Sequence, residues 1–102
     1  MIMEKEIWET IMEDSRYEIS NLGRVRNKKS GHFLACNATK SHRHPQVFLM
    51  GNQWGRLQLT VSHLVVEHFG YGMRLPYGTI VGHKDGDITN NRIENLYIVN
   101  KT

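Results

Sequence analysis

The chain has 102 residues, of which 39% are hydrophobic and 23% are charged, and its formal net charge is +3. This length predicts one domain, residues 1–102, with a single core of modest stability. No apolar run approaches the roughly 20 residues that a membrane-spanning helix needs, and the amino terminus lacks the pattern of a signal peptide. We therefore expect a cytoplasmic protein that does not act at a membrane.

Charges are unevenly distributed along the chain. The segment 1–23 has six acidic and two basic residues, whereas the segment 24–56 has seven basic residues and no acidic one. A segment that carries only cations attracts phosphate, while an ordinary solvated surface mixes both signs. We therefore expect double-stranded DNA as the partner, with a plain basic surface as the alternative. The expected DNA-binding residues are Arg24, Arg26, Lys28, Lys29, Lys40, Arg43, Arg56 and Gln58.

The first third of the chain alternates between apolar and polar residues as strands do. Trp8 is expected to cover one side of a small sheet as part of the core. Tyr17 and Ile19 share an inward face, and Val25 points inward between two arginines. Residues 28–32 have the composition of a hairpin tip, which would present basic groups to phosphates.

Two further strands are expected in the middle of the chain. Residues 47–50 form an apolar run that predicts a buried strand, and residues 56–61 alternate, with Leu57 and Leu59 inward. The outward Arg56 and Gln58 are residue types that can pair with guanine and adenine edges. The loop 39–45 before these two strands contains His42 and His44, which we interpret as exposed residues. Together with Cys36 they lack the spacing of a zinc site, and Cys36 is expected to be an inert thiol.

A short helix should follow these strands. Ser62 is expected to cap a helix over residues 62–69 that Gly70 ends. His63 on this helix is interpreted as a structural hydrogen-bonding residue. The expected fold is therefore α+β, with a small antiparallel sheet over residues 16–61 followed by the helix. Its expected core is Ile19, Val25, Phe48, Leu57, Leu59, Val61, Val65 and Phe69.

A polar loop near the carboxyl end is bounded by two apolar runs, 79–81 and 96–99. These runs predict two strands that lie side by side and bring Asn95 near His83. An imidazole can take a proton from water, and a second polar group can hold the ring in one tautomer while it does so. The pattern therefore indicates His83 as a general base and Asn95 as the residue that orients it.

Two segments of this hairpin, 83–86 (HKDG) and 90–96 (NNRIENL), resemble those of the phage and intron-encoded HNH homing endonucleases. The segment 16–26 (RYEISNLGRVR), with Trp8 before it, resembles the modular motif that precedes HNH nuclease cores in phage proteins. The resemblance implies a modular DNA-binding sheet region at residues 6–61 and an HNH-like core at residues 62–102. For a phage-encoded protein, the compartment would be the cytoplasm of the host cell.

The resemblance also implies a ββα-metal site, in which His83 is the base, Asn95 orients it, and Mg²⁺ or another divalent ion is held by two further ligands. The family's usual Asp or Asn before the histidine is Gly82 here, and the usual second ligand lies on a helix past the position of Thr102. The ββα hairpin is therefore expected to be incomplete, lacking its C-terminal helix. Asp85 and Asp87 remain as candidate metal ligands, although Asp85 is more typical of a residue that orders a turn.

Three functions compete on these grounds. The favoured hypothesis is a DNA-binding protein on an HNH homing-endonuclease scaffold, with metal-dependent phosphodiester hydrolysis weak or lost. The alternatives are an active HNH endonuclease, for which a homodimer or second chain would supply the missing ligands, and a phage-encoded inhibitor that binds a protein partner.

Overall fold

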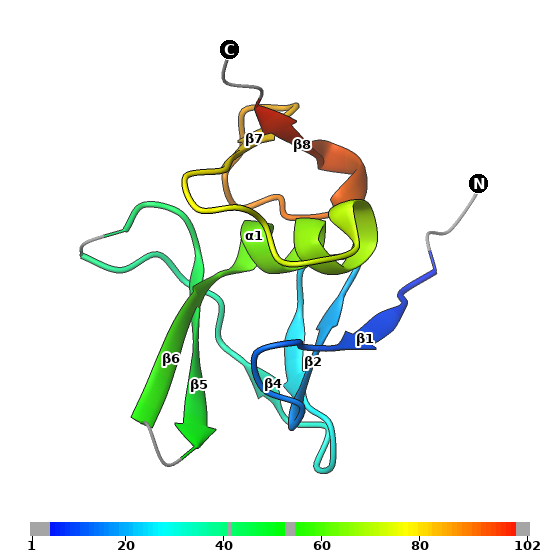
Figure 1. Ribbon diagram of the computed structural model, residues 1–102, viewed down its shortest axis with the longest axis vertical. Helices are drawn as coiled ribbons and strands as arrows, with labels where there is room; N and C mark the ends of the chain where they lie inside the picture. The colour runs from blue at the N-terminus through cyan, green and yellow to red at the C-terminus, as the bar shows by residue number, and fades with distance from the viewer. Residues whose placement is uncertain (1–4, 41, 53–54, 100–102) are drawn as a thin grey trace.

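A computed structural model describes residues 5–40, 42–52 and 55–99, and for residues 50–52 and 55–56 it describes the backbone alone. The fold is α+β, as expected, with small antiparallel sheets arranged around one short helical segment (Figure 1). In the described part of the chain, no helix combines the length and the apolar character that crossing a membrane requires.

The amino-terminal half forms a four-stranded antiparallel sheet in which each strand pairs with the next along the chain. Ile19 and Val25 are opposite each other in this sheet and are fully buried, because alternate residues of both strands point to the core. Tyr17 lies on the same inward face and is also buried. The strands are β1 (Trp8–Thr10), β2 (Tyr17–Ser20), β3 (Val25–Asn27) and β4 (Phe33–Leu34).

A separate two-stranded sheet follows, made of β5 (Gln46–Asn52) and β6 (Gly55–Thr60). The expectation of one sheet over residues 16–61 is therefore wrong, and a single bridge between Asn37 and Gln46 joins the chain before β5 to this second sheet. The polar loop between the short strand β4 and β5 allows the chain to begin a new sheet. The buried residues of this second sheet join the same core.

The register of β5 against β6 decides which apolar side chains are buried. Val47 and Leu49 pair with the inward residues Leu59 and Leu57, and both are fully buried. Phe48 pairs with the outward Gln58 and is 41% exposed, so its expected place in the core is wrong. Leu57 and Leu59 are partly buried and pack against the core, as does Phe69 from the helix that follows.

The helical segment begins one residue earlier and ends later than the sequence predicts. Helix α1 (Val61–Val66) starts after Thr60, so Ser62 is a buried helical residue rather than the N-cap. The backbone then continues as a π-helical turn, η1 (Glu67–Tyr71), and ends at Gly72, whose φ is +84°. Gly72 and not Gly70 ends the helix because it adopts the left-handed conformation that closes the last turn.

Strands β7 (Ile80–His83) and β8 (Leu96–Val99) form the expected hairpin at the carboxyl end, with a short 3₁₀ turn, η2 (Ile93–Asn95), before β8. Figure 1 shows α1 between this hairpin and the other strands. The buried Val81 and Leu96 join the same core as α1. The core therefore holds the polar end of the hairpin against the rest of the molecule.

Candidate functional site

His83 is the last residue of β7, and its ring is fixed by a second asparagine of the loop. The Nε2 of His83 lies 2.8 Å from the Oδ1 of Asn91, which is itself 5% exposed. A carboxamide oxygen can only accept, so Nε2 carries the proton and donates it. In the neutral ring Nδ1 then keeps its lone pair, which is the arrangement that a general base requires.

The described residues show no hydrogen bond between the Asn95 side chain and His83, and the orienting bond expected from Asn95 is made by Asn91 instead. The amide group of Asn95 donates to the Oδ1 of Asp85 at 2.9 Å and to the Asn90 carbonyl at 2.9 Å, and its Oδ1 accepts from the Asp85 backbone N–H. The Asn95 side chain therefore joins the start of the turn 84–90, at Asp85, to its end, at Asn90. Asn95 thus holds the shape of the loop, while Asn91 orients the ring.

The amino-terminal sheet reaches this loop through the turn between β2 and β3. The carbonyl of Asn21 accepts from the Ile93 backbone N–H at 2.9 Å. A Cβ on Gly23 would lie 3.0 Å from both the Cβ and the carbonyl oxygen of Asn91. The turn therefore packs directly on the residue that orients His83. Asn91 belongs to the segment 90–96 that carries the family resemblance. The sequence alone did not indicate that Asn91, and not Asn95, would bond to the His83 ring.

The two candidate metal ligands are engaged in the loop itself. The Asp85 carboxylate accepts from Asn90, from the Asp87 backbone N–H and from Asn95, and these bonds hold the pKa of Asp85 at about 2. Asp87 accepts from the hydroxyl and backbone N–H of Thr89, which lower its pKa as well. Both carboxylates order the turn, as Asp does in such loops. Within the described ranges, no three residues among His, Cys, Asp and Glu are grouped to hold a metal.

The position beside His83 is occupied by an aromatic ring. Gly82 pairs with Tyr97 across the hairpin, and the Tyr97 ring lies over the Gly82 Cα. A Cβ at position 82 would come within 2.7 Å of the Tyr97 hydroxyl oxygen, much closer than a van der Waals contact allows. The described residues of this hairpin therefore do not fit a divalent ion held beside His83. Sequence reasoning recognised the missing side chain at Gly82 but not the tyrosine that covers it.

The two arginines of β3 and the preceding turn are paired with acids of the segment 1–23. Arg24 forms a two-pronged ion pair with Glu6, whose pKa it lowers, and Arg26 lies 3.0 Å from Glu18. The Arg26 guanidinium also lies 3.8 Å from the centroid of the Trp8 ring. Trp8 is therefore half-buried under an arginine on the outer sheet face rather than in the core. Part of the positive charge of segment 24–56 is neutralised locally.

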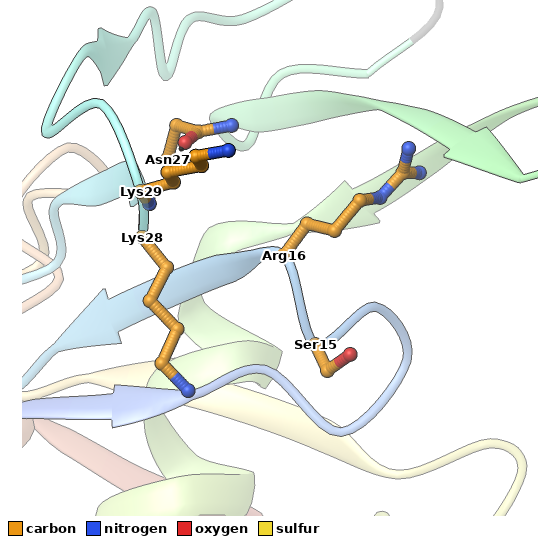
Figure 2. A pocket seen from close by; sticks show the side chains of 5 residues that line it. All are labelled: Ser15, Arg16, Asn27, Lys28 and Lys29. Carbon is orange, nitrogen blue, oxygen red and sulfur yellow. Dashed lines mark hydrogen bonds between the residues drawn. The ribbon is translucent and has the colours of Figure 1, made fainter.

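Basic groups gather at one end of this sheet. A cavity of about 350 Å³ is lined by Ser15, Arg16, Asn27, Lys28 and Lys29. Figure 2 shows Arg16 on one side of this hollow and the two lysines on the other. Arg16 pairs with Asp14, and Lys28 donates to Thr10. The Lys29 ammonium makes no ion pair with any residue that the structure describes.

The remaining expected DNA-binding residues lie elsewhere. Lys40 and Arg43 are exposed in the loop before β5, and Gln58 lies on β6 with its amide nitrogen 3.3 Å from the Nδ1 of His42. The Arg56 side chain falls outside the described part of the chain. The expected residues are thus divided among the sheet end, the loop before β5 and the β5–β6 sheet.

Comparison with known proteins agrees with this geometry. Residues 6–49 match the NUMOD4 motif, and residues 61–102 match an HNH endonuclease family. No curated protein matches the chain. A solved structure described as "DNA binding and cleavage by the HNH homing endonuclease I-HmuI" is similar with a TM-score of 0.74 and 31% sequence identity. The match covers 91% of this chain and 52% of that chain, so this chain spans about half the length of its structural neighbour. The chain is therefore similar to a NUMOD4 motif over residues 6–49 and to an HNH endonuclease domain over residues 61–102, and its fold is similar to that of part of an HNH homing endonuclease.

Proposed function

We propose that this chain binds double-stranded DNA on an HNH scaffold whose capacity for metal-dependent cleavage is weak or lost. The observation that carries the second half of this proposal is the Tyr97 ring over Gly82. The HNH resemblance implies a carboxylate or carboxamide ligand at that position, and the ring fills the space that such a side chain would need. Asp85 and Asp87 are engaged in the turn, because both oxygens of Asp85 and the Oδ1 of Asp87 already accept bonds within the loop.

DNA binding is supported by the family match and by the charge of the described surface. Lys28, Lys29, Lys40 and Arg43 are exposed cations in a segment without acids. Cations at exposed positions release counterions when they neutralise phosphates, and this release drives association. The chain's own residues thus supply binding and orientation of the duplex.

An active endonuclease is the second candidate, and the His83–Asn91 pair favours it. A ring with its Nε2 proton donated to Asn91 and its Nδ1 lone pair unused is the tautomer that can accept a proton from water. A chain that had lost all use of this chemistry would not need the ring held in one tautomer. The two candidates therefore differ in cleavage and not in binding.

A cleavage assay on supercoiled plasmid separates them. The protein is incubated with plasmid and either Mg²⁺ or Mn²⁺, beside the variants His83→Ala and Asn91→Ala. We expect no more nicking from the unmodified protein than from His83→Ala. Nicking that depends on the ion and disappears in His83→Ala would establish the active endonuclease instead.

DNA affinity should fall steeply with salt. If about four phosphates are contacted, log K against log salt should have a slope of about −3.6, which is about −0.9 for each phosphate. Replacing Lys29 by Gln should weaken binding and make the slope less steep by about one unit, because one phosphate contact is lost. Fluorescence anisotropy with a labelled duplex at several salt concentrations measures both quantities.

The matched control is Arg74→Gln, which removes the same charge outside the segment 24–56. It should leave the slope unchanged. Equal effects of the two variants would mean that net charge alone governs binding. Salt-independent binding, or tight binding to a protein and none to DNA, would support the inhibitor hypothesis.

A further inference from the structure

A second cavity, of about 380 Å³, opens beside β7 between the loop before β5 and the start of α1. Its polar lining consists of three imidazoles, one guanidinium, one carboxamide and three hydroxyl groups, and the imidazoles and the guanidinium belong to His42, His44, His63 and Arg43. None of the described residues that line it is an aspartate or a glutamate. Its composition suits an anion, and among the described residues no three of His, Cys, Asp and Glu are grouped to hold a metal.

The positive groups of this cavity lack acidic partners. The ion pairs of the described residues join Arg16 to Asp14, Arg24 to Glu6 and Arg26 to Glu18, and none involves Arg43. Burial and then the positive charges on His83, Arg43 and His63 lower the pKa of His44. Burial disfavours charge of either sign, but the contribution of these neighbouring groups to the lowered pKa of His44 reflects a positive potential that favours an anion.

His63 has one ring nitrogen without a partner. Its Nε2 donates to the Thr79 carbonyl at 3.1 Å, and its Nδ1 is buried with no hydrogen-bond partner among the described residues. Buried polar atoms are nearly always paired, so an orphaned one calls for an explanation. The Nδ1 atom is enclosed and does not itself face the cavity, so an anion bound there would act on His63 through charge, by stabilising its protonated ring. The bond to Thr79 confirms His63 as the structural hydrogen-bonding residue expected from the sequence.

The cavity adjoins the general base. The ring of His44 lies 5.6 Å from the ring of His83, measured between centroids, with 35° between their planes. Val81, two residues before His83, also lines the cavity. A nucleic-acid strand that passes His83 would therefore bring a neighbouring phosphate over this cavity.

We propose that this cavity binds one phosphodiester group of a nucleic-acid strand lying along the β7–β8 hairpin, through the exposed Arg43 and His44, with His63 in the wall of the cavity. The inference rests on the proposed DNA-binding function and adds a defined phosphate subsite to it. Guanidinium and imidazolium groups donate charge-assisted hydrogen bonds to phosphate oxygens, and Arg is suited to contacting two of them at once.

The test uses the dinucleoside phosphodiester thymidylyl-thymidine as the probe and inorganic phosphate as a second ligand. Each is titrated into isotope-labelled protein at fixed pH and ionic strength, and the ring signals of His42, His44 and His63 are followed by NMR. The phosphodiester should shift these signals in a saturable way. Arg43→Gln and His44→Gln should each weaken its binding by about tenfold, the effect of losing one charge-assisted hydrogen bond.

Lys5→Gln is the matched control, because it removes one exposed cation that lies outside the segment 24–56 and outside the lining of this cavity. It should leave the affinity of the dinucleotide unchanged. Arg43 and His44 are exposed, so both variants should keep the melting temperature of the parent. Unchanged affinity in both folded variants would overturn the proposal, as would shifts at the Arg16–Lys29 cavity alone. Binding of inorganic phosphate without binding of the dinucleotide would assign a free-anion site and overturn the strand assignment.

These outcomes are separable from the proposed function. If duplex DNA binds with a steep salt dependence while the dinucleotide leaves the three histidines unaffected, the subsite fails and the DNA-binding function stands. If the dinucleotide shifts the histidines but no duplex binds, the subsite stands and the proposed function fails.

Discussion

Replacing Gly23 by Ala should cost about 2–4 kcal/mol of unfolding free energy, through left-handed backbone strain and overpacking together. Gly23 has a φ of +87°, which L residues rarely adopt, and its Cα faces Asn91. The added methyl group would lie 3.0 Å from the Asn91 carbonyl oxygen, so backbone rather than a flexible side-chain end must move. Chemical denaturation followed by tryptophan fluorescence measures the loss.

Gly31→Ala is the matched control for this prediction. Gly31 also has a positive φ, +75°, but a Cβ there would meet nothing within 4 Å. Its substitution should therefore cost only the backbone strain, about 1–2 kcal/mol. Equal losses in the two variants would mean that the contact between the turn and Asn91 contributes nothing.

The Gly23→Ala substitution should also change the tautomer balance of the His83 ring. Asn91 orients the His83 ring through its Oδ1, so displacing the Asn91 backbone weakens the bond that selects the Nε2-protonated tautomer. The ring ¹⁵N signals of His83 report this tautomer directly. They should shift in Gly23→Ala toward a mixture of tautomers and stay unchanged in Gly31→Ala. The β1–β4 sheet would then help to position the His83 ring.

Local alternation allowed much of this fold to be predicted. Ile19, Val25, Val61 and Val65 are fully buried, as expected, because each follows the period of its own strand or helix. The exposure of Phe48 could not be predicted in this way. A continuous apolar run does not indicate which of its residues face the core, and the register against β6 decides it.

The candidate site was less predictable because its contacts join residues that the sequence pattern does not pair. Asn91 and Asn95 are both in the recognised string, and only the path of the loop places Asn91 at the ring and Asn95 beneath the turn. The ion pair of Arg24 with Glu6 joins residues 18 positions apart through sheet pairing. A charge count by segment cannot show that such cations are already neutralised.

Gly82→Asp alone should fail to create a divalent-ion site and should destabilise the protein. The Tyr97 ring covers the place where the new side chain must begin, so the ring has to swing away or the strands must separate. Because the clashing atoms lie at the outer end of a ring that is 47% exposed, the cost should lie near the lower end of the about 1–3 kcal/mol that overpacking produces. Gly82→Ala is the control without a carboxylate, and it should show a similar loss of stability. Thermal melting with and without Mn²⁺ measures stability and ion binding in the same samples.

Removing the ring together with the glycine should reverse both effects. In Gly82→Asp/Tyr97→Ala the carboxylate gains the space that the phenol occupied, and Tyr97 is 47% exposed, so its loss opens little of the core. We expect this double variant to melt above Gly82→Asp and to bind Mn²⁺ about tenfold more tightly than the unmodified protein, because an added carboxylate supplies one hard ligand. Tyr97→Ala alone should show no gain in ion binding. If Gly82→Asp by itself bound Mn²⁺ tightly at an unchanged melting temperature, the tyrosine would not be what closes this position, and the loss of the ligand side chain would be the whole explanation.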